Sequence, residues 1–281
     1  MDPKKYEVKK IKQTNANEHF FDPLLPRHPF FMLCIGPRGS GKSNCMIDMV
    51  QNKFKPTYWD LIIVYCKTID DDDKWKGIRQ YVDDEMVRKN YSDEQLMKDY
   101  YAISQIHSMV PKFRSLILMD DMISDNFANK YKIDPVGMIA TMGRHKGISM
   151  GITSQLYRAL SPAMRNNCTN LCIFNVHNAK EIVKLAEENQ GLMDPKSFRG
   201  MLHQIWGDKD NSLSNDAERP FLHINANKDF HERFSKNWDQ VIHIGGKKPE
   251  EKLLEEKKKP PLPTDREPSS ESESESESEE E

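Results

Sequence analysis

Short apolar runs alternate along this chain with polar segments of helical spacing. The runs are rich in aliphatic and β-branched residues and span about four to eight residues, which is typical of buried strands. They predict strands at 28–35, 60–66, 115–119, 147–153, 171–176 and 221–225. Because helical segments lie between most of these runs, we expect parallel β-α-β units in one sheet that helices cover on both faces.

The segments between the runs carry helix signals. A capping sequence at Ser92 opens a helix whose apolar face holds Leu96, Tyr100, Ile103 and Ile106. Further helices are expected at 42–52, 134–143, 179–189 and 195–205. The alternation of strands and helices predicts an α/β domain.

The two ends of the chain differ in composition from its middle. Residues 1–27 are polar and then proline-rich, which indicates an N-terminal arm, and 28–246 form the predicted domain. Residues 247–281 carry 7 Lys/Arg against 13 Asp/Glu, and therefore −6 of a whole-chain charge of −3. Their charge runs, prolines and alternating Ser and Glu predict a disordered tail, either a solubilising segment or a substrate for an acidophilic kinase. Residues 1–246 therefore carry a net charge of +3. This weakly basic charge is compatible with nucleic-acid binding without indicating it.

Cysteine usage and hydropathy limit the class of protein. Cys168 and Cys172 are spaced C-x3-C, and no second Cys/His pair at zinc spacing accompanies them. The five cysteines are therefore expected to be buried reduced thiols, which favours a reducing intracellular location. No apolar run approaches the roughly 20 residues of a transmembrane helix, so no membrane span is expected.

A phosphate-binding motif follows the first predicted strand. The residues expected to bind nucleotide are Gly36, Pro37, Arg38, Gly39, Ser40, Gly41, Lys42 and Ser43. The pattern G-x4-G-K-S between a strand and a helix is that of a P-loop, whose backbone N–H groups surround phosphate oxygens. Lys42 would reach the β- and γ-phosphates, and the Ser43 hydroxyl would bind Mg²⁺. The fold class that this motif indicates is a P-loop NTPase.

Two acids end the third strand. Leu116 to Met119 runs into Asp120 and Asp121, a pattern that delivers carboxylates next to a P-loop. Asp120 is expected to hold Mg²⁺ through water and Asp121 to polarise the attacking water, a role that glutamate plays more often. A water-activating acid indicates hydrolysis and disfavours a small-molecule kinase, which must exclude water. An acidic turn after a core strand is the alternative interpretation.

The signatures of a GTPase are missing. Asn227-Lys228-Asp229 places its Asp one residue too early for N-K-x-D, and no D-x-x-G follows the third strand. ATP is therefore the expected nucleotide.

Other polar groups could complete the site. Gln155 ends the fourth strand, where it would sense the γ-phosphate or, alternatively, serve as an ordinary loop residue. Ring ATPases usually receive a cation from the neighbouring subunit, for which Arg144, Arg158 and Arg165 are candidates. An arginine of this kind is more often a solvated or DNA-facing residue, which is the alternative interpretation for each of them.

The order of these elements resembles the viral genome-packaging ATPases of poxviruses and other nucleocytoplasmic large DNA viruses, a branch of the FtsK–HerA superfamily. The resemblance rests on Phe31–Ser43, Leu116–Met122, and the stretch Arg144-His145-x-x-Ile148-Ser149 through Ser154-Gln155 to Met164-Arg165-Asn166-Asn167. It spans about 28–225, so neither terminal segment belongs to it.

The resemblance implies a RecA-like ASCE core with the Gln155 strand between the P-loop and Asp120 strands. It implies a Mg²⁺-dependent ATPase that works as a homo-oligomeric ring, a pentamer or hexamer, and pumps double-stranded DNA without sequence preference. Arg144 is the first choice for the arginine finger and Arg165 the second. Many relatives have Glu where Asp121 stands, which makes its role as a base the least secure.

The same resemblance implies partners and a location. Channel-facing cations would contact DNA phosphates, and the candidates are Arg158, Lys196, Arg199 and Lys209. Capsid or inner-membrane proteins would be docking partners at the viral assembly site in the host cytoplasm, with the virion as a second location. The alternatives are a cellular HerA-like translocase or helicase, whose N-terminal barrel has no counterpart here, and a nucleotide-dependent scaffold or switch protein.

Overall fold

The structure is a computed structural model that describes residues 7–10, 22–54, 56–122, 134–207 and 219–244. Contacts divide the chain into two units, Met1–Gly245 and Gly246–Glu281, and the second unit lies outside the described residues. The predicted tail, most of the predicted arm and Lys209 also lie outside them. The domain boundaries therefore stay predictions.

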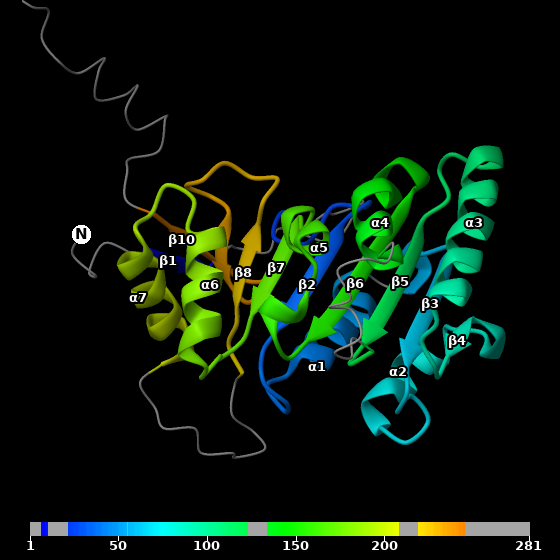
Figure 1. Cartoon of the computed structure of the whole chain (residues 1–281), viewed down its shortest axis with the longest axis horizontal. Coiled ribbons are helices and arrows are strands. Elements are labelled where there is room, and N and C mark those ends of the chain that lie inside the picture. Colours follow the sequence, from blue (N-terminus) through cyan, green and yellow to red (C-terminus); the bar gives the residue numbers. More distant parts are fainter. Residues whose placement is uncertain (1–6, 11–21, 55, 123–133, 208–218, 245–281) are drawn as a thin grey trace, which may run out of the picture. The chain divides into compact units, whose positions relative to one another are not determined.

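Within the described residues, ten strands form one sheet (Figure 1). They are β1 (Glu7–Lys10), β2 (Phe31–Ile35), β3 (Leu61–Cys66), β4 (Val87–Arg88), β5 (Ser115–Asp120), β6 (Ile148–Ser154), β7 (Asn170–Ile173), β8 (Leu222–Asn225), β9 (Phe234–Lys236) and β10 (Gln240–His243). The strand order is β1-β10-β9-β8-β7-β2-β6-β5-β3-β4. Strands β7, β2, β6, β5, β3 and β4 are parallel, and β8, β9, β10 and β1 extend them as antiparallel neighbours.

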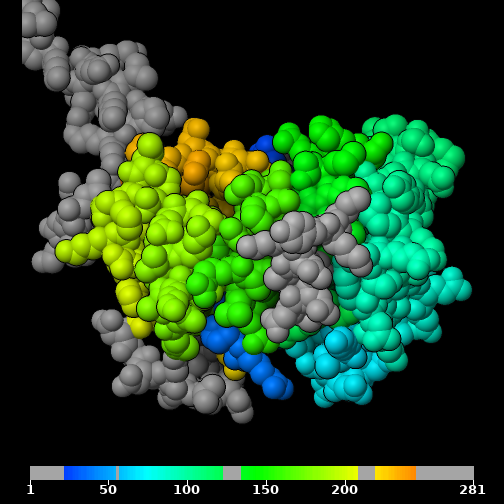
Figure 2. All heavy atoms as spheres, in the orientation of Figure 1, coloured from blue at the N-terminus to red at the C-terminus, as the bar shows by residue number. Residues whose placement is uncertain are grey.

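Helices cover both faces of the parallel part. They are α1 (Lys42–Asp48), α2 (Lys76–Arg79), α3 (Asp93–Met109), α4 (Pro135–Met142), α5 (Pro162–Asn166), α6 (Ala179–Asn189) and α7 (Pro195–Trp206). Shorter helical turns are η2 (Met49–Lys53), η3 (Pro56–Tyr58), η4 (Asp73–Trp75), η5 (Asp84–Met86), η7 (Gly143–Lys146) and η8 (Tyr157–Ala159). Side chains of α3 to α7 pack on one face, and those of α1, η2 and α2 on the other. Helices α3 to α7 lie in front of the sheet in Figure 1, and their atoms cover much of the face seen in Figure 2.

The central strand β2 shows why both faces need cover. Its five residues are all buried. Leu33 and Ile35 join the apolar cluster under α3 to α7, whereas Met32 and Cys34 join the cluster under α1. Side chains alternate across a strand, so a strand buried on both faces is a continuous apolar run, and this is the pattern from which it was predicted.

Most predicted elements are confirmed, with shifted ends. The predicted strand at 28–35 begins only at Phe31, the strand at 171–176 ends at Ile173, and the helix at 42–52 is α-helical to Asp48 and continues as the π-helical turn η2. The expected insertion of the Gln155 strand is confirmed, because β6 lies between β2 and β5.

Several short elements were not predicted. Strands β1, β4, β9 and β10 have two to four residues and no apolar run, and the pairing with neighbouring strands defines them. Helix α5 has five residues, but it carries a signal that could have revealed it. Ser161 caps it, with its Oγ 3.3 Å from the Met164 N–H that donates to it, and Pro162 occupies the first turn.

No helix among the described residues combines the length and apolar character that a bilayer crossing needs. All five cysteines are free; four of them are buried, as predicted, whereas Cys168 is only partly buried.

His223 gives the fold a pH dependence. Its ring is 1% exposed, and its nitrogens lie 3.1 Å from Ser235 Oγ and 3.0 Å from Asn170 Oδ1. Burial, with a smaller contribution from the charge of Lys228, lowers the pKa of His223 from 6.5 to about 3. The folded state therefore requires a neutral ring, and its stability falls as the pH drops below 6.5 because the unfolded chain binds the proton.

At pH 5 this loss amounts to about 2 kcal/mol of unfolding free energy, at about 1.4 kcal/mol per pH unit. We expect His223→Gln to remove it, so that urea unfolding at pH 7 and pH 5 differs by about 2 kcal/mol less than in the wild type. His203→Gln, on the exposed side of α7, should retain the wild-type difference. An unchanged pH dependence in His223→Gln would contradict the assignment.

Candidate functional site

The carboxyl ends of β2, β6 and β5 meet at one edge of the sheet. Register pairs Ile35 with Ser154 and Met119 with Ile152, so the residues that follow these strands emerge side by side. Ligand sites of open α/β sheets lie at this edge. The loop 36–43, Asp120, Asp121 and Gln155 are therefore brought together, as the sequence predicted.

The loop after β2 is curled and fixed to β6. The Gly36 N–H donates to the Ser154 carbonyl at 3.2 Å, which holds the loop against the neighbouring strand. A Cβ at Gly36 would lie 2.6 Å from Cβ of Phe174, so only glycine fits there. Gly41 has a φ of 99°, a left-handed conformation that glycine adopts without strain, and it caps α1. The first N–H groups of α1 consequently face the space above the loop.

Two side chains of this loop are placed to bind an anion. Lys42 is 5% exposed, and its Nζ donates to the Pro37 carbonyl at 2.9 Å. Burial lowers the pKa of Lys42, although the charges of Asp121 and Asp120 act against this. The Oγ atom of Ser40 is buried without a hydrogen-bond partner among the described residues. A phosphate above the loop would supply the oxygens that these two groups lack.

Asp120 connects three elements through one oxygen atom. Its Oδ1 accepts hydrogen bonds from Ser43 Oγ at 2.7 Å and from Thr153 Oγ1 at 2.8 Å. Thr153 Oγ1 also accepts from the Asp121 N–H at 2.9 Å. The hydroxyl of Thr153 therefore fixes both acids at the end of β5, a role that the sequence did not reveal because a threonine inside a strand is usually structural.

Lys74 is a second residue that sequence reasoning missed. Its Nζ lies 2.8 Å from Asp72 Oδ2 and 3.9 Å from Asp120 Oδ2. Burial lowers the pKa of Lys74, but the hydrogen bond to Asp72 and the charge of Asp120 outweigh it, and the net shift is upward. The site thus holds a second cation beside Asp120. No sequence motif marks Lys74, because η4 comes close to β5 only in the folded chain.

A cleft of about 560 Å³ opens beside the loop. Pro37 and Arg38 line it from the loop, Asp121 from the end of β5, and Gln155 from the end of β6. Asp121 has a φ of 49°, a left-handed conformation that aspartate tolerates better than most residues. Both Asp121 and Gln155 are exposed to this cleft, so each can contact a water molecule or an anion held there.

A second cleft, of about 500 Å³, lies on the other side of the loop. Asn44 and Cys45 of α1 line it, opposite Phe221 and Trp238. Arg219 also lines it and donates from Nη1 to the Gly39 carbonyl at 2.5 Å. Sequence reasoning missed this arginine, because nothing in the local pattern links it to a loop so distant along the chain.

Of the arginine candidates, Arg144 lies apart from these groups, whereas Arg158 is bonded to Glu181, which lines the first cleft. Arg144 is exposed in η7, before β6, whereas Gln155 follows the same strand. The seven residues of β6 separate them by roughly 20 Å, at about 3.3 Å per residue. Arg165 is 13% exposed and pairs with Glu188 at 2.9 Å, and Arg158 pairs with the buried Glu181 at 2.8 Å.

The donor atoms at Asp120 fit a magnesium ion. Ser43 Oγ and Asp120 supply oxygen ligands within hydrogen-bonding distance of each other, and Mg²⁺ prefers carboxylate and hydroxyl oxygens together with phosphate and water. We therefore expect these two residues to hold the ion.

We expect Gly36→Ala to destabilise the fold by about 1–3 kcal/mol, since the new methyl group would overlap Phe174 and Ser40. Gly200→Ala is the matched control: nothing lies within 4 Å of its Cβ position in α7, and it should stabilise the fold by about 0.5–1 kcal/mol. Urea unfolding measures both. Unfolding of Gly36→Ala at the wild-type midpoint would contradict the close packing of the loop.

Solved structures of viral proteins share a similar fold. B204 from Sulfolobus turreted icosahedral virus, described as the DNA-packaging ATPase, matches with a TM-score of 0.52 and 15% identity over 79% of this chain and 100% of that chain. The genome packaging NTPase B204 from Sulfolobus turreted icosahedral virus 2, in complex with AMP, matches with a TM-score of 0.51 and 14% identity over 78% of this chain and 98% of that chain. At these identities the similarity shows a shared fold. No curated protein matches the chain significantly.

The sequence itself matches a family of viral proteins. Residues 17–193, more than half of the chain, match the family described as Poxvirus A32 protein. The match includes all three stretches that carried the resemblance, Phe31–Ser43, Leu116–Met122 and Arg144 to Asn167. The fold class and the resemblance predicted from the sequence are thereby confirmed, and the chain belongs to the poxvirus A32 protein family.

Proposed function

We propose that this protein is an ATPase that drives double-stranded DNA into a virus particle. The observation that carries the proposal is the arrangement at one sheet edge of Lys42, Ser43 and Asp120, with Asp121 and Gln155 in the adjoining cleft. Membership in the poxvirus A32 family supports the viral context. The similar B204 structures are described as genome packaging NTPases, one of them with bound AMP, which supports nucleotide binding by this fold.

The loop 36–43 binds the triphosphate. Lys42 exchanges its present acceptor, the Pro37 carbonyl, for β- and γ-phosphate oxygens, and the free hydroxyl of Ser40 donates to a phosphate. Because Lys42 is already buried and fixed, little side-chain freedom is lost on binding. Mg²⁺ held by Ser43 and Asp120 would neutralise charge on the β- and γ-phosphates.

Hydrolysis takes place in the cleft beside the γ-phosphate position. The carboxylate of Asp121 accepts a proton from the attacking water, and the amide of Gln155 orients that water and contacts the γ-phosphate. ATP and water give ADP, phosphate and a proton. Thr153 positions Asp121 through its backbone N–H, which compensates in part for a side chain one methylene shorter than the glutamate of many relatives.

The second cleft takes the adenosine half of the nucleotide. It adjoins Gly41 and Asn44 at the start of α1, and the rings of Phe221 and Trp238, 5.2 Å apart, form its apolar wall. Asn227-Lys228-Asp229 does not contribute to base recognition. Strand β8 is antiparallel to β7 and pairs Asn225 with Asn170, so the turn that follows lies at the sheet edge away from the P-loop.

The proposed working unit is a homo-oligomeric ring, a pentamer or hexamer. Arg144 is the finger that suits it best: it projects from the sheet edge opposite its own nucleotide site and has no ion pair among the described residues, so only a neighbouring site is within its reach. Arg165 is held by Glu188 of its own chain. DNA would be held through its phosphates, with the exposed Lys196 and Arg199 of α7 as candidate contacts.

The proposed location is the viral assembly site in the host cytoplasm. Capsid or inner-membrane proteins are the proposed docking partners there. Family membership supports this context.

Replacement of Lys42 by Ala is expected to lower ATP turnover at least ~100-fold, because the cation that stabilises the transferring phosphoryl group is lost. Phosphate release measured in the presence of Mg²⁺ and long duplex DNA tests this. Lys98→Ala, on the exposed side of α3, is the control and should turn over ATP at the wild-type rate.

Turnover that persists in Lys42→Ala would overturn the site assignment. Wild-type turnover should rise when long duplex DNA is added. An ATP turnover rate that does not change when DNA is added would instead favour a nucleotide-dependent switch protein.

Rings assembled from two kinds of variant subunit test the assignment of Arg144 as the arginine finger. Arg144→Ala and Asp121→Asn subunits should each be inactive alone, whereas an equal mixture regains up to about a quarter of the wild-type rate, since that share of interfaces pairs an intact Asp121 with a neighbour's intact Arg144. If Arg144 is the finger, Arg165→Ala subunits should be active alone, and an equal mixture with Asp121→Asn should show about half of their rate, as dilution without rescue predicts. Rescue by the Arg165 mixture alone would transfer the role to Arg165.

A further inference from the structure

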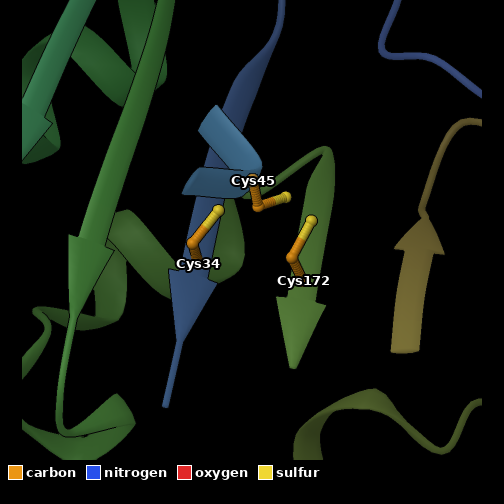
Figure 3. Close-up of side chains that lie close together, drawn as sticks. All are labelled: Cys34, Cys45 and Cys172. Carbon is orange, nitrogen blue, oxygen red and sulfur yellow. The ribbon is translucent and has the colours of Figure 1, made fainter. Parts of the chain in front are cut away.

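Three cysteines from three elements meet beneath the P-loop (Figure 3). Cys34 lies on β2, Cys172 is its register partner on β7, and Cys45 comes from α1. Their Sγ atoms all lie within 4.8 Å of one another. Cys34 and Cys172 are fully buried, and Cys45 is 7% exposed. In the part of the chain that the structure describes, no other group of three Cys, His, Asp or Glu side chains has such spacing.

The donor set is purely sulfur, and its surroundings are apolar. All three cysteines belong to the cluster that includes Met32 and Phe174. Thiolate ligands of this kind select soft ions, above all Cu(I) and Zn²⁺, over Mg²⁺ or Ca²⁺. The cluster is therefore chemically distinct from the oxygen site at Asp120.

The spacing suits an ion better than a disulfide. Three sulfurs at about 2.3 Å from one central ion lie about 4 Å apart, which requires only a small contraction from the present positions. A disulfide would require two sulfurs to approach to about 2.0 Å, with Cys34 and Cys172 held on adjacent hydrogen-bonded strands.

The surroundings favour an ion that accepts three ligands. Zn²⁺ in structural sites is almost always tetrahedral, and no fourth Cys, His, Asp or Glu side chain among the described residues joins the group. Cu(I) forms stable sites with sulfur ligands alone. Interaction with the thiols of Cys172 and Cys45 lowers the pKa of Cys34, whereas burial raises the pKa values of Cys45 and Cys172. Each of these thiols releases its proton when it becomes a ligand.

An ion can reach the cluster from the surface. Cys45 lines the cleft of about 500 Å³ beside α1, together with Gly41 and Asn44. The least buried of the three cysteines is thus the one that faces the opening.

We propose that Cys34, Cys45 and Cys172 form a three-sulfur site for one Cu(I) ion in the floor of the P-loop. Bound copper links β2, β7 and α1, the three elements that hold the loop on either side. It therefore stabilises the loop without contacting the nucleotide.

The test is a titration of the reduced full chain with Cu(I) held by bicinchoninate, under exclusion of oxygen. The wild type should withdraw one equivalent of copper from the chelator, and saturation should raise Tm by about 5 °C or more. X-ray absorption should show sulfur ligands alone, at about 2.3 Å. The variant Cys45→Ser replaces the most accessible cysteine with a similar shape and should lower copper affinity at least tenfold. Cys172→Ala should act in the same way.

Cys66→Ala and Cys168→Ala are matched controls, because neither cysteine belongs to the group of Cys34, Cys45 and Cys172. Both variants should bind copper like the wild type. Circular dichroism and urea unfolding of the metal-free proteins confirm that each variant is folded. Equal copper affinity in the wild type and in folded Cys45→Ser would overturn the proposal. Tight binding of one Zn²⁺ together with failure to compete for Cu(I) would overturn the choice of ion.

Discussion

One carboxylate oxygen, Oδ1 of Asp120, joins the parts of the nucleotide site. It accepts hydrogen bonds from Ser43 at the start of α1 and from Thr153 on β6, while its own backbone belongs to β5. These partners come from three elements that approach one another only in the folded sheet. Asp120 is also 5% exposed, so a charge in this position requires both donors and nearby cations. Ser43 and Thr153 are the donors, and Lys42 and Lys74 are the nearby cations. The geometry of the loop, of the acids and of the cleft depends on this one group.

The sequence predicted the central sheet because its strands are buried on both faces. Such strands are continuous apolar runs, and the P-loop and the two acids follow two of them directly. Lys42, Ser43 and Asp120 could therefore be placed from local pattern alone. The same reasoning placed Gln155 correctly at the sheet edge, since parallel strands that lie side by side present their carboxyl ends together. Its chemical role stays a prediction.

What the sequence could not predict depends on contacts between distant segments. Lys74 reaches Asp120 from η4, and Arg219 reaches the loop from the far end of the domain sequence; neither stands in a motif. Strands β9 and β10 have little apolar character, and pairing defines them: β9 pairs with β8, and β10 pairs with β9. The cysteines illustrate the same limit. Spacing along the chain argued against zinc, yet Cys34, Cys45 and Cys172 converge because register and helix packing bring them together.

The position of β6 has a mechanical consequence. The strand is hydrogen-bonded on one side to β2 and on the other to β5, and its residues Ile148 to Ser154 are all buried. It cannot slide or rotate by itself without breaking both ladders. Gln155 and Arg144 stand at its two ends, so a change at one end reaches the other only if the whole subunit turns as a rigid body. In a ring built from such subunits, the timing between neighbouring sites would be set by the tilt of entire domains and not by the rearrangement of a loop.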